Sequence, residues 1–116
     1  MATLPTQVIV RTGITPSFSA VAGGGDACEC GDDIYLEFKN TNASTYTVNL
    51  AIPSTASTYS GVTYTNTSVT IPATTGDKII GPISALYKDP TTGLCTITYT
   101  GTTTNGTVAC LKLQEN

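Results

Sequence analysis

Short segments of alternating apolar and polar residues fill the chain from Ile34 onward, and turn signals separate them. In IYLEFKN, Ile34, Leu36 and Phe38 alternate with polar neighbours, which is typical of a strand with one buried face. Similar short strands are expected at residues 45–52, 61–66, 68–72, 78–83, 94–101 and 107–113. No segment keeps a helical apolar period over three turns, and only residues 84–93 leave room for a single helical turn. The sequence therefore predicts an all-β protein, a single antiparallel β-sandwich or jelly roll.

A chain of 116 residues is long enough for one domain with one apolar core. The residues on the apolar faces of the expected strands are predicted to form this core. They are Leu36, Phe38, Val48, Leu50, Val69, Ile71, Ile79, Ile97 and Leu111.

Residues 1–25 differ from the rest, and we expect them to form an extended N-terminal arm ahead of a sandwich domain at 26–116. Gln7–Val10 predicts one short strand, and the following segment is rich in Gly, Pro and Ser. The arm carries apolar side chains that need burial and an arginine that could reach a carboxylate on a partner. We therefore expect a contact with neighbouring subunits through Val8, Ile9, Val10, Arg11, Ile14 and Phe18.

The composition excludes several function classes. The net charge is −3, and the five Lys and Arg residues are scattered, which argues against nucleic acid as a partner. The 24 threonines favour strands and supply hydroxyl groups for hydration. The N-terminus has no pattern of a secretory signal, and no apolar run is long enough to span a membrane, so no membrane partner is expected.

Catalytic motifs are also missing from the sequence. The chain contains no histidine, which removes the usual general base and the commonest zinc ligand. No serine lies in a G-x-S-x-G turn, and the Gly23–Gly25 run lacks the Lys-Ser/Thr of a phosphate-binding loop. We therefore expect neither an enzyme nor a bound cofactor.

The stretch AGGGDACECGDD (residues 22–33) looks like a metal site, because it places Cys28 and Cys30 among four acidic residues. The spacing fits neither a pair of C-x-x-C zinc knuckles nor an EF-hand calcium loop. An Asp-rich turn before a strand is the simpler interpretation. No metal is therefore expected.

Four cysteines are available for disulfides: Cys28, Cys30, Cys95 and Cys110. A bridge within Cys28-Glu29-Cys30 would be strained. The apolar set Ala109, Leu111 and Leu113 predicts that Cys110 points away from the core while Cys95 points into it, which would prevent a bridge between those two. Two alternatives remain: bridges of unknown connectivity from Cys28 and Cys30 to the last two strands, or four free thiols.

The order of several short motifs resembles the small decoration, or cement, proteins of tailed-phage capsids. These motifs are TQVIVRTGITPSFSA, GGD and IYLEFKN in the first half, and VTIPATTGDKIIGPI and the final strand pair in the second. Arg11-Thr12-Gly13, Gly24-Gly25-Asp26 and Gly81-Pro82 follow in the family's order. The cysteines depart from the family pattern, and a covalent reinforcement of this lineage would explain them.

The resemblance implies a compact β-sandwich without catalysis, commonly a homotrimer, on the outer capsid face where shell subunits meet. The partner would be the major capsid protein, and the chain would be made in the host cytoplasm and carried on the virion. The alternative is a carbohydrate-binding or adhesive β-sandwich, in which outward tyrosines such as Tyr35, Tyr59 and Tyr87 would stack on sugars.

Overall fold

The computed structural model describes residues 2–53, 58–59, 62–63 and 65–114, and strands make up nearly all of their regular structure. Strands of the first sheet, sheet A, are β1 (Ala2–Thr3), β4 (Asp26–Cys28), β6 (Tyr46–Leu50), β9 (Thr67–Ile71) and β11 (Cys95–Gly101). Those of sheet B are β2 (Thr6–Ile9), β3 (Ser19–Ala20), β5 (Ile34–Asn40), β10 (Gly76–Ile80) and β12 (Gly106–Leu113). A small ribbon joins β7 (Thr58–Tyr59) to β8 (Val62–Thr63), and residues 85–87 form one 3-10 turn.

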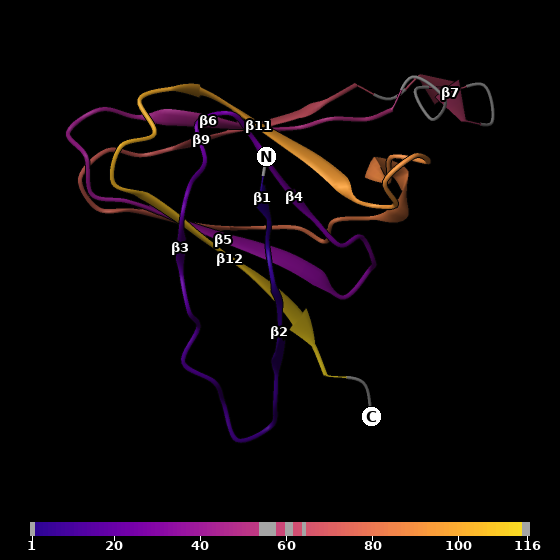
Figure 1. Cartoon of the computed structure of the whole chain (residues 1–116), viewed down its shortest axis with the longest axis horizontal. Helices are drawn as coiled ribbons and strands as arrows, with labels where there is room; N and C mark the ends of the chain where they lie inside the picture. Colours follow the sequence, from indigo (N-terminus) through magenta and orange to yellow (C-terminus); the bar gives the residue numbers. More distant parts are fainter. Residues whose placement is uncertain (1, 54–57, 60–61, 64, 115–116) are drawn as a thin grey trace.

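Sheet A has the strand order β1-β4-β11-β6-β9, and sheet B the order β10-β5-β12-β2, with β3 also paired to β12 (Figure 1). The predicted all-β class is confirmed, and the two sheets are compatible with a β-sandwich. The prediction of a purely antiparallel fold is wrong, because β1 runs parallel to β4 and β2 runs parallel to β12. In both parallel pairs, a strand of the N-terminal segment lies beside a strand that comes much later in the sequence.

The core lies between the inner faces of the two sheets. Sheet B contributes Leu36 and Phe38, and sheet A packs Tyr99 against Phe38 edge to face, with ring centroids 6.1 Å apart. Tyr46 makes a second edge-to-face contact with Tyr99 at 6.2 Å. The predicted core residues that belong to this buried cluster are Leu36, Phe38, Val48, Leu50, Ile71 and Ile97, and Val69 packs against it while half-buried.

Two predicted core positions are corrected by the structure. Ile79 is 65% exposed, because it lies opposite Glu37 on the outer face of sheet B, whereas Ile80 lies opposite Leu36 and is buried. Two adjacent isoleucines give no alternation, so the pattern could not decide which one faces inward. Leu111 is buried as predicted, but on the outer side of β12 and not in the central cluster.

The outer face of sheet A is a network of hydroxyl and amide side chains. Asn49 donates from Nδ2 to Thr100 Oγ1 (3.1 Å) and accepts at Oδ1 from Ser68 Oγ (2.8 Å). The hydroxyls of Thr47 and Thr70 lie 3.4 Å apart across the β6–β9 pair. The threonine hydroxyls thus make this face polar and able to bind water without charged side chains.

The N-terminal segment contributes to both sheets. β1 pairs with β4 in sheet A, Leu4 is buried in the core, and β2 then pairs with β12 in sheet B. The chain between β2 and β3 extends beyond the sheets at the end of the molecule where the C-terminus lies (Figure 1). Gln7 holds the returning chain, because its side-chain amide donates to Ser17 O and accepts from Ser17 N, both at 2.8 Å.

A pair of substitutions tests the inner and outer faces of sheet B. Leu36→Ala should lower the free energy of unfolding by about 2–5 kcal/mol, because it leaves a cavity in the core. Ile79→Ala, in the adjacent strand, should cost less than about 1 kcal/mol, because its side chain is exposed. Urea titration followed by circular dichroism measures both values, and equal costs would contradict this assignment of faces.

Candidate functional site

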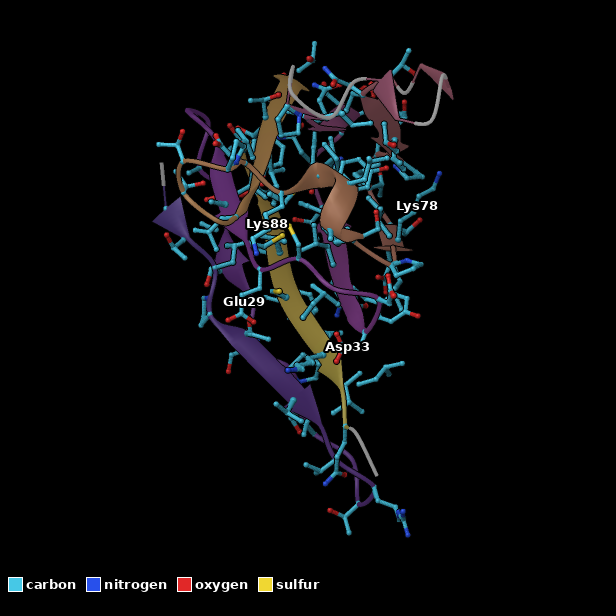
Figure 2. All side chains as sticks on the ribbon, turned by 90° about the vertical axis from the view of Figure 1, so that its right-hand side faces the viewer. Glu29, Asp33, Lys78 and Lys88 are labelled. Carbon is cyan, nitrogen blue, oxygen red and sulfur yellow. The ribbon has the colours of Figure 1, made fainter. Side chains whose placement is uncertain are left out.

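The structure brings all four cysteines to one place inside the sandwich. Cys28 in β4 lies directly opposite Cys95 in β11, and Cys28, Cys95 and Cys110 are fully buried. Cys30, on the loop that follows β4, is half-buried and packs against the core cluster. The sulfur atoms lie in the interior near the labelled Glu29 and Lys88 (Figure 2).

The prediction that Cys110 points away from the core is wrong. Its side chain is 1% exposed and belongs to the core cluster, as does that of Val108 two residues earlier. Ala109 and Leu111 are buried on the opposite side of β12, so this strand is buried on both faces. Alternation cannot reveal which side of such a strand faces the second sheet.

The four thiols are neighbours in a row, in the order Cys110, Cys28, Cys95 and Cys30. Contacts with Cys110 and Cys95, together with burial, raise the pKa of the Cys28 thiol. Contact with Cys95 and burial likewise raise the pKa of Cys30. Contacts with Cys28 and Cys30 lower the pKa of the Cys95 thiol. In the described structure all four are free thiols.

Asp26, the first residue of β4, has a structural role beside the cysteines. It is fully buried, and its Oδ2 accepts hydrogen bonds from the Tyr99 hydroxyl (2.6 Å) and the backbone N–H of Ala22 (3.3 Å). Its Oδ1 is buried without a hydrogen-bond partner among the described residues. Asp26 thereby fixes the end of the glycine run against sheet A.

The other three acidic residues of this stretch lie nearer the surface. Glu29 (Figure 2) and Asp32 are exposed, and Asp33 forms an ion pair with Lys112 at 4.0 Å. Within the part of the chain that the structure describes, no three His, Cys, Asp or Glu residues are grouped to hold one metal ion. Nor do the described residues include a helix with the length and apolar character needed to cross a bilayer.

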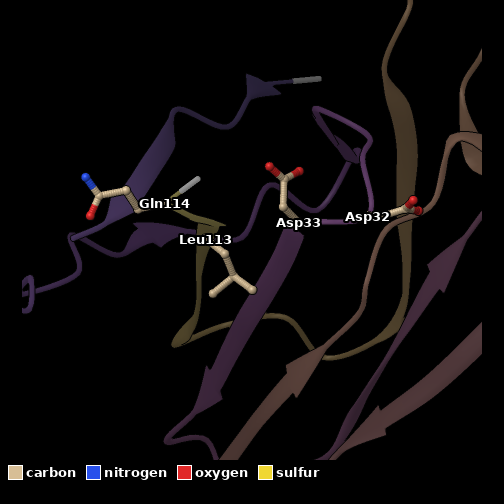
Figure 3. Close-up of a pocket in the computed structure, with 4 residues that line it drawn as sticks. All are labelled: Asp32, Asp33, Leu113 and Gln114. Carbon is tan, nitrogen blue, oxygen red and sulfur yellow. The ribbon is translucent and has the colours of Figure 1, made fainter. Parts of the chain in front are cut away.

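Two open depressions adjoin each other at the end of sheet B. One is lined by Asp32, Asp33, Leu113 and Gln114 (Figure 3), and the other by Ile9, Val10, Arg11, Leu113 and Gln114. The Arg11 backbone N–H donates to Gln114 Oε1 at 3.2 Å, which joins the end of β2 to the chain after β12. We call the edge formed by β2 and the chain after β12 the end patch. It comprises Ile9, Val10, Arg11, Leu113 and Gln114, which line the second depression, and Val8, which points to the other face of the same strand.

The end patch is apolar and lies on an edge strand. Val8 is 44% exposed and Leu113 is 45% exposed, while Ile9 and Val10 are half-buried. β2 is the last strand of sheet B, so one of its sides has no neighbouring strand within the described structure. Such a surface has the chemistry to bind another protein through apolar contacts and strand pairing.

The six residues predicted as contacts do not form one surface. Val8, Ile9, Val10 and Arg11 share the end patch. Phe18 lies elsewhere. Its ring is half-buried beneath Lys39, whose Nζ is 4.4 Å from the ring centroid. Ile14 is half-buried in the chain between β2 and β3. Which of these residues contact a partner stays a prediction.

Sequence reasoning missed the contributions of Gln114 and Tyr99. Gln114 binds the arm only because β2 and β12 run side by side, and no local pattern signals that pairing. The bond of Tyr99 to Asp26 spans 73 residues of sequence, and no local pattern signals it either. Of the tyrosines considered for sugar stacking, Tyr87 is half-buried against the core and hydrogen-bonded to Thr67. The side chain of Tyr59 lies outside the described residues.

No protein-family model matches this chain, and searches of curated proteins and of solved structures find no match either.

Tyr99→Phe should lower the free energy of unfolding by about 1–3 kcal/mol, because it removes a hydrogen-bond donor from a buried carboxyl group. Thr98→Ala, at an exposed position of the same strand, provides the control and should cost less than about 1 kcal/mol. Chemical denaturation measures both, and an unchanged stability for Tyr99→Phe would contradict the role of this bond.

Stability should fall at alkaline pH because of two buried tyrosines. Burial raises the pKa of Tyr46 to about 12, and burial with the bond to Asp26 raises the pKa of Tyr99 above its ordinary value. In the unfolded chain both ionise near pH 10. Their contribution is complete below pH 10 and is lost as the pH rises toward the folded values. Denaturation at pH 8–12, followed with phenolate absorbance, should show this loss, and Tyr46→Phe should reduce it.

Proposed function

We propose that this protein is a structural virion protein that decorates and stabilises the outer surface of a tailed-phage capsid. It binds the major capsid protein where shell subunits meet, and it acts as a homotrimer. It is made in the host cytoplasm and carried on the outer face of the virion. The observation that carries the proposal is the exposed, apolar end patch on the free edge of sheet B.

The exposure of apolar side chains favours the end patch as the contact surface. Three large apolar residues of the described chain are notably exposed, and two of them, Val8 and Leu113, belong to this patch. Apolar surface of this kind gains stability when a partner covers it. The free side of β2 offers unpaired backbone groups that a strand of a neighbouring subunit can complete.

The sequence resemblance points to the same segment, since TQVIVRTG contains β2 and most of the end patch. The proposal includes the jelly-roll relationship of the two sheets and the role of residues 1–25 as a contact arm. The uncharged hydroxyl face of sheet A is then the side turned to solvent.

Decoration would stabilise the shell by linkage. A protein that binds only the assembled lattice favours that state by RT ln(1 + [L]/Kd), which is about 4 kcal/mol per site at a thousandfold excess over Kd. Many such sites around a closed shell together resist heat and internal pressure without any chemical step.

A charge placed in the end patch tests the proposal. Val8→Asp should weaken binding to undecorated capsids of the encoding phage at least about tenfold, or about 1.4 kcal/mol, because it buries a carboxylate in the contact. Ile79→Asp is the matched control, since Ile79 is exposed on the opposite edge strand of the same sheet. Cosedimentation with capsids measures both, and circular dichroism checks that each variant is folded.

Point substitutions are preferable to deletion of residues 1–18, which would remove buried Leu4 together with β1 and β2. Failure of the wild-type chain to bind and protect capsids would contradict the proposal. Retention of the isolated chain on a glycan surface would instead favour the carbohydrate-binding alternative. Equal capsid binding by Val8→Asp and wild type would place the contact outside the end patch.

A further inference from the structure

The thiol cluster joins three parts of the chain that are distant in sequence: β4 with the loop after it, β11 of the same sheet, and β12 of the other sheet. Cys28 and Cys95 lie opposite each other in sheet A, and Cys110 faces them from sheet B, where it pairs with Leu36. The contacts run in the order Cys110, Cys28, Cys95, Cys30. The two middle residues each contact two thiols, and the two outer residues each contact one.

We propose that these cysteines are the partners of two disulfides, Cys28–Cys110 and Cys30–Cys95, which form when the folded chain meets an oxidising environment. The contact order decides the pairing. A bridge between the middle residues Cys28 and Cys95 would leave Cys110 and Cys30 at opposite ends of the row without a partner. Only the outer-to-middle pairing uses all four sulfur atoms. This inference does not depend on the capsid role.

Each bridge would tie a different part of the fold. Cys28–Cys110 links β4 of sheet A to β12 of sheet B through the core. Cys30–Cys95 anchors the loop after β4 to β11. Lys88 lies beside this disulfide, because its backbone forms an isolated antiparallel β-bridge with Cys95. Both close long loops of the unfolded chain, the case in which a cross-link limits unfolded conformations most.

Oxidation of the folded chain begins at Cys30, because the other three thiols are fully buried. A small-molecule disulfide such as oxidised glutathione exchanges with Cys30 and releases one glutathione thiol. Cys95 then attacks the Cys30 sulfur, which forms Cys30–Cys95 and releases the second glutathione. The pair loses two electrons and two protons, and the donor disulfide gains them.

Thiol–disulfide exchange within the cluster then forms the second disulfide, Cys28–Cys110. Cys28 attacks the Cys95 sulfur and frees Cys30, and Cys110 then attacks the Cys28 sulfur and frees Cys95. A second donor molecule forms Cys30–Cys95 again. In total, four thiols and two donor disulfides give two protein disulfides and four glutathione thiols. Each exchange within the protein occurs between neighbouring cysteines.

Peptide mapping tests the connectivity. The reduced chain is incubated with oxidised glutathione, blocked by alkylation, and denatured without reductant. Glutamyl endopeptidase then separates Cys28 from Cys30 at Glu29, and chymotrypsin separates Cys95 from Cys110 at Tyr99. We expect a mass loss of about 4 Da, one hydrogen per thiol, with the linked peptides Cys28–Cys110 and Cys30–Cys95. The melting temperature should rise by roughly 10 °C or more and fall again with reductant.

Two variants test the route and the pairing separately. Cys30→Ser should keep the folded chain reduced in oxidised glutathione, yet allow Cys28–Cys110 to form after unfolding and oxidative refolding. The double variant Cys30→Ser/Cys95→Ser should still form Cys28–Cys110 on refolding.

A Cys28–Cys95 peptide as the end product of complete oxidation, or four thiols that stay reduced in the wild-type chain, would overturn the proposal. So would thiols that resist alkylation until a chelator is added, because that protection indicates a bound metal.

Discussion

The pairing of β12 organises this protein. β12 is hydrogen-bonded to β5 along one side, and its other side is shared by β2 and β3. This arrangement places Cys110 inside the sandwich, Lys112 beside Asp33, and Leu113 beside the start of the chain. A shift of one residue in its register would move each of these side chains to the other face.

The sequence was sufficient for the strands with one buried face. In β5 and β6 the apolar residues alternate strictly, so the inward positions of Leu36, Phe38, Val48 and Leu50 followed from the pattern. Where two neighbouring residues are both apolar, the sequence pattern could not decide which of them faces the core. Ile79 and Ile80, and likewise Ala109 and Cys110, are distinguished only by what packs against each side of the strand. That information is tertiary, and local alternation does not contain it.

The candidate sites show the same division. The presence of four cysteines was plain, but their convergence depends on the register of β4 with β11 and on the packing of sheet A over sheet B. The N-terminal apolar residues were recognised as needing burial, and the structure places them in two regions. Val8 lies at the end patch, while Phe18 lies under Lys39. The purely antiparallel expectation failed because no local signal reports that distant strands run side by side in the same direction.

The position of β2 also has a consequence for how the chain is made. Thr6 lies beside Cys110, 104 residues later in the sequence. During synthesis β2 leaves the ribosome well before its partner, so it stays unpaired until β12 has been made. Contacts between residues so far apart in sequence slow folding. An apolar strand that is still unpaired can meanwhile pair with another nascent chain. β2 is therefore the strand most open to wrong pairing during synthesis. Chains made close together on one messenger can exchange this strand and pair it with each other's β12.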